Sequence, residues 1–342
     1  MGNIAIHGFG RIGRSALKAA LTGDLFVPVS ISDIRDLATF AALFAVDTNY
    51  GLWREPVSAD GNTLRIGGRE IAYIDSTKEL PDWKALGVDV VVDATGRATV
   101  REIAQQHLDR GAKKVLVSAP SKTLQDCDAV LLPGVNLDQY DPKEHHIISM
   151  ASCTTNALAP VVKVLRERFG IKNGFFSTVH AYTNTQSLTD QPMRDRRDCW
   201  AAAENIIPSS SGAAKALKFI WPDLAITGKA YRVPVRTGSI VELNALVGKS
   251  TTAEEVREVF RAAATDTRSP SSACTSGRSI RDECVSPTMR LDANSSSSTP
   301  MMPLSDPALA ASRKASRTAS SLALCSTTAF SSTMLPVRTG TR

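Results

Sequence analysis

The chain has 342 residues, of which 43% are hydrophobic and 22% charged. This length predicts about two domains, and no run approaches the roughly 20 consecutive apolar residues that a membrane span requires. The N-terminus shows no export signal, and six cysteines are too few for a disulfide scaffold. We therefore expect a cytoplasmic protein with reduced thiols and no membrane association.

The net charge of +6 is unevenly distributed along the chain. The segment 268–342 includes nine basic and four acidic side chains, whereas the segment 1–267 is close to neutral. The basic segment also contains a single aromatic residue, Phe330. Because the charge excess lies in one unusual segment that lacks aromatic platforms, we expect no nucleic-acid binding.

Apolar runs alternate with helical patterns from the N-terminus to about position 150. The helical patterns are RSALKAALTG and LATFAALFA, and the strand-like runs are NIAIHGF, VPVSISD, VDVVVDATG, KKVLVSA and HHIISMAS. Near-continuous apolar runs separated by helices are typical of parallel strands buried on both faces. The pattern predicts a doubly wound, Rossmann-type α/β domain over residues 1–151.

Between positions 174 and 246 the strand-like runs become longer. The runs GFFSTVHAYT and KAYRVPVRTGSIVELNALV alternate apolar with polar residues, as expected of a largely antiparallel sheet with one solvated face. Thr252 and Glu255 have the spacing of a capping box, which predicts a helix over EEVREVFRAAA. These features predict a second, α+β domain over residues 152–266.

The composition changes sharply after Asp266. Within 268–342, 27 positions are Ser or Thr, and positions 295–298 are four consecutive serines. Such a segment has too little apolar surface to offset the entropy of ordering, so we expect residues 267–342 to pack poorly and to be unable to complete a sheet. The abrupt switch, without a linker, favours a shift of reading frame over a genuine domain as its origin.

A glycine triplet, Gly8, Gly10 and Gly13, follows the first strand-like run and opens a helix. In that context the first glycine permits a tight turn, the second lets the backbone approach a pyrophosphate, and the third allows close helix–strand packing. Asp33 ends the second run, where its carboxylate would accept hydrogen bonds from ribose hydroxyls. The pattern predicts NAD binding. NADP is less favoured because the acidic side chain of Asp33 would repel its 2′-phosphate, although the nearby Arg35 weakens that discrimination. The alternative is a glycine-rich turn without a cofactor, in which Asp33 caps the next helix.

Cys153 stands directly before a helical pattern. That pattern ends at Gly170 and is formed by Leu158, Val161, Val162, Leu165 and Phe169. Because proline is tolerated in the first turn of a helix, Pro160 places Cys153 at or just before the helix N-terminus. Unpaired N–H groups and the helix dipole favour a thiolate there, so Cys153 is a candidate nucleophile. A small buried cysteine is the alternative.

His180 lies beyond this helical pattern, in the run FFSTVHAYT. One helix and one returning strand span the chain from Cys153 to His180, so the two side chains can meet at a sheet edge. A Cys–His pair supplies a nucleophile and a general base. A core histidine with satisfied hydrogen bonds is the alternative.

Several polar groups near this pair are suited to bind phosphate. Thr154, Thr183 and the serine-rich turn at 209–212 offer hydroxyls, and Arg232 and Arg236 add bidentate cations. An ordinary helix cap or a solvated charge is the alternative for each of them.

Four features of the chain occur together: GFGRIG, ASCTTN, the strand with His180, and NIIPSSSGAAKA followed by RVP. With them, about residues 1–266 resemble the phosphorylating glyceraldehyde-3-phosphate dehydrogenase family. The resemblance implies NAD-dependent oxidation and phosphorylation of D-glyceraldehyde 3-phosphate to 1,3-bisphosphoglycerate. Cys153 would carry a thiohemiacetal and then a thioester, with His180 as base. A homotetramer is also implied. An erythrose-4-phosphate dehydrogenase is one alternative; a non-catalytic or misfolded NAD-binding product is the other, if the segment 267–342 is genuine.

The resemblance also assigns binding residues, and no metal. For the cofactor these are Gly8, Gly10, Arg11, Ile12, Gly13, Asp33, Thr95, Gly96 and Ser121. Thr183 and Arg232 would bind the substrate phosphate. Ser152, Ser211 and Gly212 would bind the attacking inorganic phosphate. Thr154 and Arg197 are further residues for substrate or phosphate binding.

Overall fold

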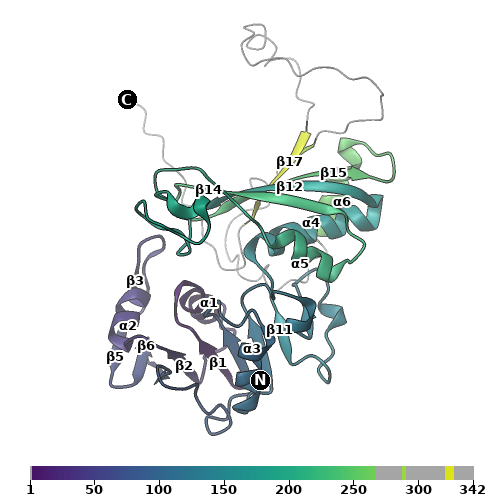
Figure 1. Ribbon diagram of the computed structural model, residues 1–342. Coiled ribbons are helices and arrows are strands. Elements are labelled where there is room, and N and C mark those ends of the chain that lie inside the picture. The colour runs from purple at the N-terminus through teal and green to yellow at the C-terminus, as the bar shows by residue number, and fades with distance from the viewer. Residues whose placement is uncertain (1, 266–286, 290–319, 327–342) are drawn as a thin grey trace.

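The computed structural model describes residues 2–265, 287–289 and 320–326, which fold into two main sheets with their helices (Figure 1). One sheet has nine strands, in the spatial order β10 (Ala129–Val130), β11 (Ile147–Ser149), β9 (Lys114–Val117), β8 (Val90–Asp93), β1 (Ile4–His7), β2 (Ser30–Asp33), β7 (Arg69–Asp75), β6 (Thr63–Ile66) and β5 (Val57–Asp60). The other has six strands, in the order β13 (Ile207–Ser209), β14 (Ile226–Val233), β12 (Ile171–Ala181), β15 (Ser239–Val247), β17 (Ser320–Ser326) and β16 (Pro287–Met289).

In the nine-stranded sheet, all neighbouring strands from β10 through β7 pair in parallel. Only β6 and β5, at one edge, pair antiparallel. The chain passes through α1 (Arg11–Thr22) between β1 and β2, α2 (Leu37–Ala45) after β2, and α3 (Arg101–Asp109) between β8 and β9. Since β2 and β8 flank β1 on opposite sides, a crevice forms at the carboxyl ends of these strands. The predicted doubly wound sheet is confirmed. The antiparallel edge, and the small hairpin of β3 (Val46–Asp47) and β4 (Gly51–Leu52), were not predicted.

Strand β2 is shorter than the apolar run VPVSISD that predicted it. It begins at Ser30, and the two valines before it are exposed, Val27 to 44% and Val29 to 38%. Pro28 lies between them and has no N–H group to donate to a neighbouring strand. The proline therefore delays the strand without changing its carboxyl end at Asp33.

The six-stranded sheet is built around β12. This strand pairs in parallel with β14 and antiparallel with β15, and the remaining pairs of the sheet are antiparallel. The run KAYRVPVRTGSIVELNALV is divided between β14 and β15, because the chain turns at Pro234 and again at Gly238, whose φ is +89°. The prediction of a largely antiparallel second sheet is confirmed.

Two short strands of the C-terminal segment belong to this sheet. Strand β17 pairs antiparallel with β15 and with β16. The prediction that the segment is unable to complete a sheet is therefore wrong for these strands. It was based on the average composition of the whole segment, which does not reflect the local apolar run SLALC. The expectation of poor packing for residues 266–286, 290–319 and 327–342 lies outside the described residues.

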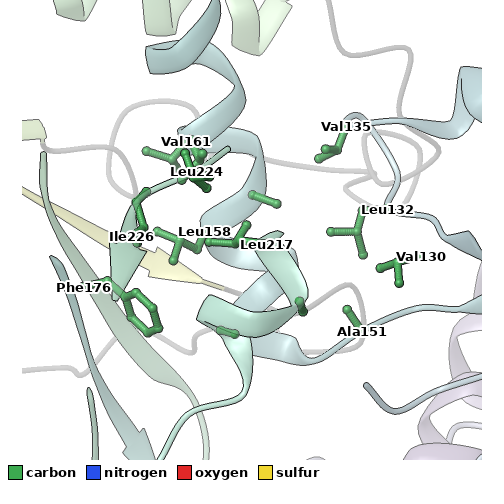
Figure 2. Close-up of a cluster of buried hydrophobic side chains, with 14 of the residues drawn as sticks. Val130, Leu132, Val135, Ala151, Leu158, Val161, Phe176, Leu217, Leu224 and Ile226 are labelled. Carbon is green, nitrogen blue, oxygen red and sulfur yellow. The ribbon is translucent and has the colours of Figure 1, made fainter. Parts of the chain in front are cut away.

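Helix α4 (Cys153–Phe169) is packed between the two sheets by one hydrophobic cluster (Figure 2). Its side chains Leu158 and Val161 lie in one cluster with Leu217 of α5 (Ala213–Ile220) and with Phe176 and Ile226 of the six-stranded sheet. On the other side the same cluster takes in residues before α4 and in the nine-stranded sheet, including Val115, Val117, Val130, Leu132, Val135 and Ile147. This burial fixes the position and direction of α4 relative to both sheets.

The helix ends only partly follow the predicted signals. Helix α4 begins at Cys153 and its last residue is Phe169, with Gly170 after it, as predicted, but Pro160 lies in its interior. The expectation that Pro160 lies in the first turn was therefore wrong, although the predicted start of the helix is correct. Tertiary burial of α4 compensates for the N–H group that the proline removes.

Helix α6 (Ala253–Thr265) begins with half of the predicted capping box. The hydroxyl of Thr252 accepts a hydrogen bond from the Glu255 N–H at 3.2 Å. The Glu255 carboxylate accepts from the hydroxyl of Thr251 instead of closing the box on Thr252. Among the described residues, no helix is long and apolar enough to cross a membrane.

A buried polar network joins α3 to the carboxyl ends of β1 and β8. The indole of Trp83 donates to Nδ1 of His107 at 3.1 Å, and Nε2 of His107 lies 3.1 Å from the Asp93 carboxylate. Because an indole N–H can only donate, Nδ1 is unprotonated, and Nε2 must carry the hydrogen that Asp93 accepts. His107 thus has no lone pair left for a metal ion. Asp93 also accepts from the N–H and hydroxyl of Thr95, so the network holds the loop after β8.

His7, whose ring lies 5.0 Å from that of His107, couples this network to pH. Burial is the main cause that lowers the pKa of His7 from 6.5 to about 4; the electrostatic effect of the neighbouring His107 ring acts in the same direction, and Asp93 and Asp33 oppose it. Between these values the unfolded chain takes up a proton that the folded protein excludes, so the free energy of unfolding falls as the pH is lowered through this range, by at most about 3 kcal/mol. The substitution His7→Asn is expected to remove this part of the pH dependence. Urea unfolding of both proteins at several pH values from 7 to 4 measures it, and equal pH dependence in the two would contradict the assignment.

Candidate active site

The glycine-rich turn between β1 and α1 has the geometry predicted for it. Gly8 has a φ of +90°, and a Cβ on Gly13 would overlap the carbonyl oxygen of Gly8. Both positions therefore require glycine, the first for the turn and the third for packing. A Cβ on Gly10 would have no atom within 4 Å. The backbone at Gly10 thus borders open space, which a pyrophosphate can occupy.

Asp33 closes this turn from the end of β2. One oxygen of its carboxylate accepts from the N–H of Phe9 at 2.6 Å and the other from the N–H of Ile34 at 2.6 Å. Each oxygen keeps a further lone pair for a ribose hydroxyl. The alternative in which Asp33 caps the next helix is wrong, because Asp36 caps α2 through the N–H of Thr39.

The other residues predicted for the cofactor follow the same edge of the sheet. Arg11 and Ile12 form the first turn of α1, and Ile12 is 45% exposed. Thr95 is held by Asp93, next to Gly8, and Gly96 has a φ of +72° with nothing within 4 Å of the position that a Cβ would take. Ser121 is buried after β9, against the thiol of Cys127. The crevice, the open glycines and Asp33 together fit a dinucleotide.

Cys153 is the first residue of α4. The hydroxyl of Ser152 accepts from the N–H of Thr155 at 3.1 Å and caps the helix. Ala151 has a φ of +54°, an unusual conformation for a residue with a side chain, and such strain is concentrated at functional sites. The amide of Asn156 donates to the carbonyls of Met150 and Ser152 and thereby holds the strained turn. This role of Asn156 was not predicted from the sequence, where its place in the first turn after Cys153 is the available signal.

The thiol of Cys153 meets the imidazole of His180. Sγ lies 3.3 Å from Nε2, across the gap between the start of α4 and the end of β12. Burial on its own would raise the pKa of the Cys153 thiol. The hydrogen bond and charge of His180, with hydrogen bonds from Thr154, outweigh burial, so the pKa of Cys153 lies below its ordinary value. In contrast, burial raises the pKa of Cys127.

Arg232 completes this cluster from β14. In the parallel pairing of β12 and β14 it lies opposite His180, and its Nη1 is 2.7 Å from Nδ1 of the imidazole. Burial lowers the pKa of Arg232, and the charge of Cys153 acts in the opposite direction. Arg232 is predicted to bind phosphate from the sequence. Its contact with His180 was missed, because the register of two strands that are far apart along the chain is not visible in a sequence pattern.

The other residues predicted for phosphate lie at three places. Ser152 and Thr154 are beside Cys153, and Ser211 and Gly212 precede the first residue of α5. Thr183 follows β12, where its hydroxyl lies 3.0 Å from that of Thr185. Arg197 instead forms an ion pair with Asp195, at 2.6 Å. The described contacts do not bring Arg197 to the Cys–His pair.

Comparison with known proteins agrees with this arrangement. The family model for the NAD-binding domain of glyceraldehyde 3-phosphate dehydrogenase matches residues 2–101, and the model for the C-terminal domain of that enzyme matches residues 152–298. A glyceraldehyde-3-phosphate dehydrogenase of Kitasatospora aureofaciens is 50% identical over 269 residues, which are 77% of this chain and 80% of the relative. That of Geobacillus stearothermophilus is 47% identical over 264 residues, 76% and 78% of the two chains.

The matched residues include the glycine-rich turn, in 2–101, and both Cys153 and His180, in 152–298. The identities of 50% and 47% extend over about four fifths of the relatives, far more than two motifs alone would give. The chain therefore belongs to the glyceraldehyde-3-phosphate dehydrogenase family of NAD-dependent oxidoreductases.

Proposed function

We propose that this chain oxidises D-glyceraldehyde 3-phosphate with NAD⁺ and inorganic phosphate to 1,3-bisphosphoglycerate. The observation that carries the proposal is the 3.3 Å contact between Sγ of Cys153 and Nε2 of His180 at the N-terminus of α4. A thiolate is the nucleophile that aldehyde chemistry of this kind needs, and the lowered pKa of Cys153 favours it.

The chain's own groups account for each bond that changes. The Cys153 thiol gives its proton to His180, and the thiolate attacks the aldehyde carbon while His180 returns that proton to the carbonyl oxygen, which forms a thiohemiacetal. His180 then removes the hydroxyl proton as general base while hydride leaves the same carbon. When bound, NAD⁺ supplies the hydride acceptor. Oxidation at the same carbon leaves a thioester on Cys153, and inorganic phosphate then displaces the sulfur to give the acyl phosphate.

Two groups of residues are proposed to hold the two phosphates. Arg232 and Thr183 bind the phosphate of the substrate, since they lie at the ends of β14 and β12 beside the Cys–His pair. The inorganic phosphate is assigned to Ser152, Thr154, Ser211 and Gly212, with Arg197 after release from Asp195. The guanidinium of Arg232 and the hydroxyl of Thr183 suit an anion at the first place, and hydroxyls at the N-termini of α4 and α5 suit one at the second.

Residues 1–151 are proposed to bind the cofactor and residues 152–266 the substrate. NAD is preferred to NADP because the carboxylate of Asp33 would repel a 2′-phosphate. A homotetramer is the assembly that we propose from the family.

The substrate is tested by the initial rate of NADH formation. We expect faster turnover of glyceraldehyde 3-phosphate than of erythrose 4-phosphate, and a strict requirement for inorganic phosphate, because the thioester needs phosphate for its release. Faster turnover of the four-carbon sugar without phosphate would show that the protein is an erythrose-4-phosphate dehydrogenase.

Two serine variants serve as controls in the same assay. Cys153→Ser is expected to abolish turnover while NAD binding remains, since it removes the nucleophile and leaves the glycine-rich turn intact. Cys199→Ser should retain activity, because Cys199 contacts only its own loop among the described residues. Retained NAD binding in the inactive variant separates loss of chemistry from misfolding.

The glycine-rich turn provides a matched pair of substitutions. Gly10→Ala places a methyl group in open space, so we expect normal stability, within about 0.5 kcal/mol, but NAD binding weakened at least about tenfold, or roughly 1.4 kcal/mol. Gly13→Ala drives its methyl group into the Gly8 carbonyl and is expected to cost about 3 kcal/mol of stability or more. Thermal melts and NAD titrations distinguish the two. Unchanged NAD affinity in Gly10→Ala would place the cofactor elsewhere.

A further inference from the structure

One buried hydroxyl joins two segments of the site. Ser149, the last residue of β11, is 0% exposed, and its hydroxyl donates to the carbonyl of Ala119 at 2.9 Å and accepts from the N–H of Ala151 at 3.2 Å. A hydroxyl has one hydrogen and two lone pairs, so it can make both bonds at the same time. Ala119 precedes Ser121 in the segment after β9, and Ala151 lies two residues before Cys153. One side chain therefore connects the predicted cofactor segment to the turn that carries the thiol.

The turn at Ala151 needs such a contact because its backbone is strained. Ala151 has a φ of +54° and is buried in the cluster around α4 (Figure 2). A Cβ disfavours this left-handed conformation, so the turn persists only while neighbouring groups hold it. Ser149 accepts from the N–H of the strained residue itself. One buried hydrogen bond and the strain of one left-handed residue are of similar size in free energy, so loss of the hydroxyl is enough to let the turn relax.

The other end of this contact is fixed independently. In the segment after β9, the N–H groups of Ser118 and Lys122 donate, each at 2.9 Å, to backbone carbonyls at the end of β8 and in the loop that follows it. These bonds hold the segment around Ala119 against that loop, and they do not involve Ser149. The Ala119 carbonyl is thus a fixed reference point for the Ser149 hydroxyl.

The turn before α4 sets the backbone of the first residue of the helix. Packing holds the axis of α4, but the large apolar side chains that bury this helix begin at Leu158, more than one helical turn after Cys153. The placement of Cys153 therefore also depends on how the chain enters the helix, and the conformation of Ala151 determines that entry.

We propose that Ser149 is a positioning residue for Cys153. Its hydroxyl holds Ala151 in the strained conformation and ties the turn before α4 to the segment 119–121. This inference rests on the proposed function, in which Cys153 is the nucleophile and the segment binds the cofactor. Among the described residues the hydroxyl contacts only backbone groups, so its effect belongs to the chemical step and not to the binding of either ligand.

Steady-state kinetics of the full-length Ser149→Ala protein test the proposal. We expect kcat for glyceraldehyde 3-phosphate to fall at least about tenfold, because a small misplacement of a reacting atom costs up to about 100-fold in rate. The KM of the sugar and the Kd of NAD should each change by less than about threefold, since both binding sites keep their own contacts. An unchanged kcat, or a loss that appears only in KM or in NAD binding, would overturn the proposal.

The strain at Ala151 provides a second variant, which separates positioning from general destabilisation. In Ala151→Gly the left-handed conformation carries no Cβ penalty, so the turn can keep its shape without the hydroxyl. We expect Ser149→Ala to lower kcat by less than about threefold in the Ala151→Gly background, against at least about tenfold in the otherwise unmodified chain. Equal losses in the two backgrounds, or failure to fold in both, would assign Ser149 to the fold as a whole and overturn the proposal.

Ser30→Ala is the matched control. Ser30 is a serine of β2 in the same sheet, it is 1% exposed, and its hydroxyl has no hydrogen-bond partner among the described residues. Its substitution should leave kcat within about twofold of the unmodified protein. A loss in this control as large as that in Ser149→Ala would attribute the effect to the removal of any buried hydroxyl and would overturn the proposal.

The rate at which iodoacetamide labels Cys153 separates this inference from the function on which it rests, since labelling needs neither sugar nor cofactor. Cys153 should be labelled at least about threefold more slowly in Ser149→Ala, because the thiolate depends on the placement of the thiol. Unchanged labelling would show that the thiol has not moved and would overturn the positioning role, while the proposed function stands if the unmodified protein oxidises glyceraldehyde 3-phosphate. If the unmodified protein does not oxidise that sugar, the proposed function fails, and slower labelling in the variant still supports the inference.

Discussion

Burial of α4 between the two sheets is the constraint on which the site depends. Each buried leucine or valine of this helix contributes roughly 1.5–3 kcal/mol, and Leu158, Val161, Val162 and Leu165 all lie in one cluster with both sheets. The helix axis therefore cannot move without opening that cluster. Cys153 at its first position, and His180 at the end of β12, are held at 3.3 Å by packing that lies well away from the chemistry.

The pKa of Cys153 depends on the groups that surround the thiol at the start of α4. Burial disfavours a thiolate, and the helix N-terminus offsets this by only about 0.3–1 kcal/mol at ordinary sites. The close contact with His180 and the hydrogen bonds from Thr154 are the larger effects and set the direction of the pKa shift. Arg232 does not contact the sulfur in this hydrogen-bonded unit; it contacts Nδ1, the other nitrogen of the His180 ring. The three side chains thus form one hydrogen-bonded unit, to which α4, β12 and β14 each contribute one member.

Local chemistry made much of this predictable from the sequence. The bounds of α2 and the turn at Gly8 follow from periodicity and glycine geometry, and Cys153 was placed correctly at a helix start. Long-range packing accounts for the failures. Pro160 is tolerated inside α4 because the helix is buried on both sides, the pairing of His180 with Arg232 depends on strand register, and β17 joins a sheet despite the polar composition around it.

The most direct test of the account is the rate at which each cysteine reacts with iodoacetamide, followed by peptide mapping. Cys153 is expected to be labelled much faster than Cys127 or Cys199 near neutral pH, because it combines a lowered pKa with a helix N-terminus and a histidine partner. The advantage should disappear in His180→Asn. Even labelling of the three cysteines in the unmodified protein would contradict the thiolate pair at the centre of the account.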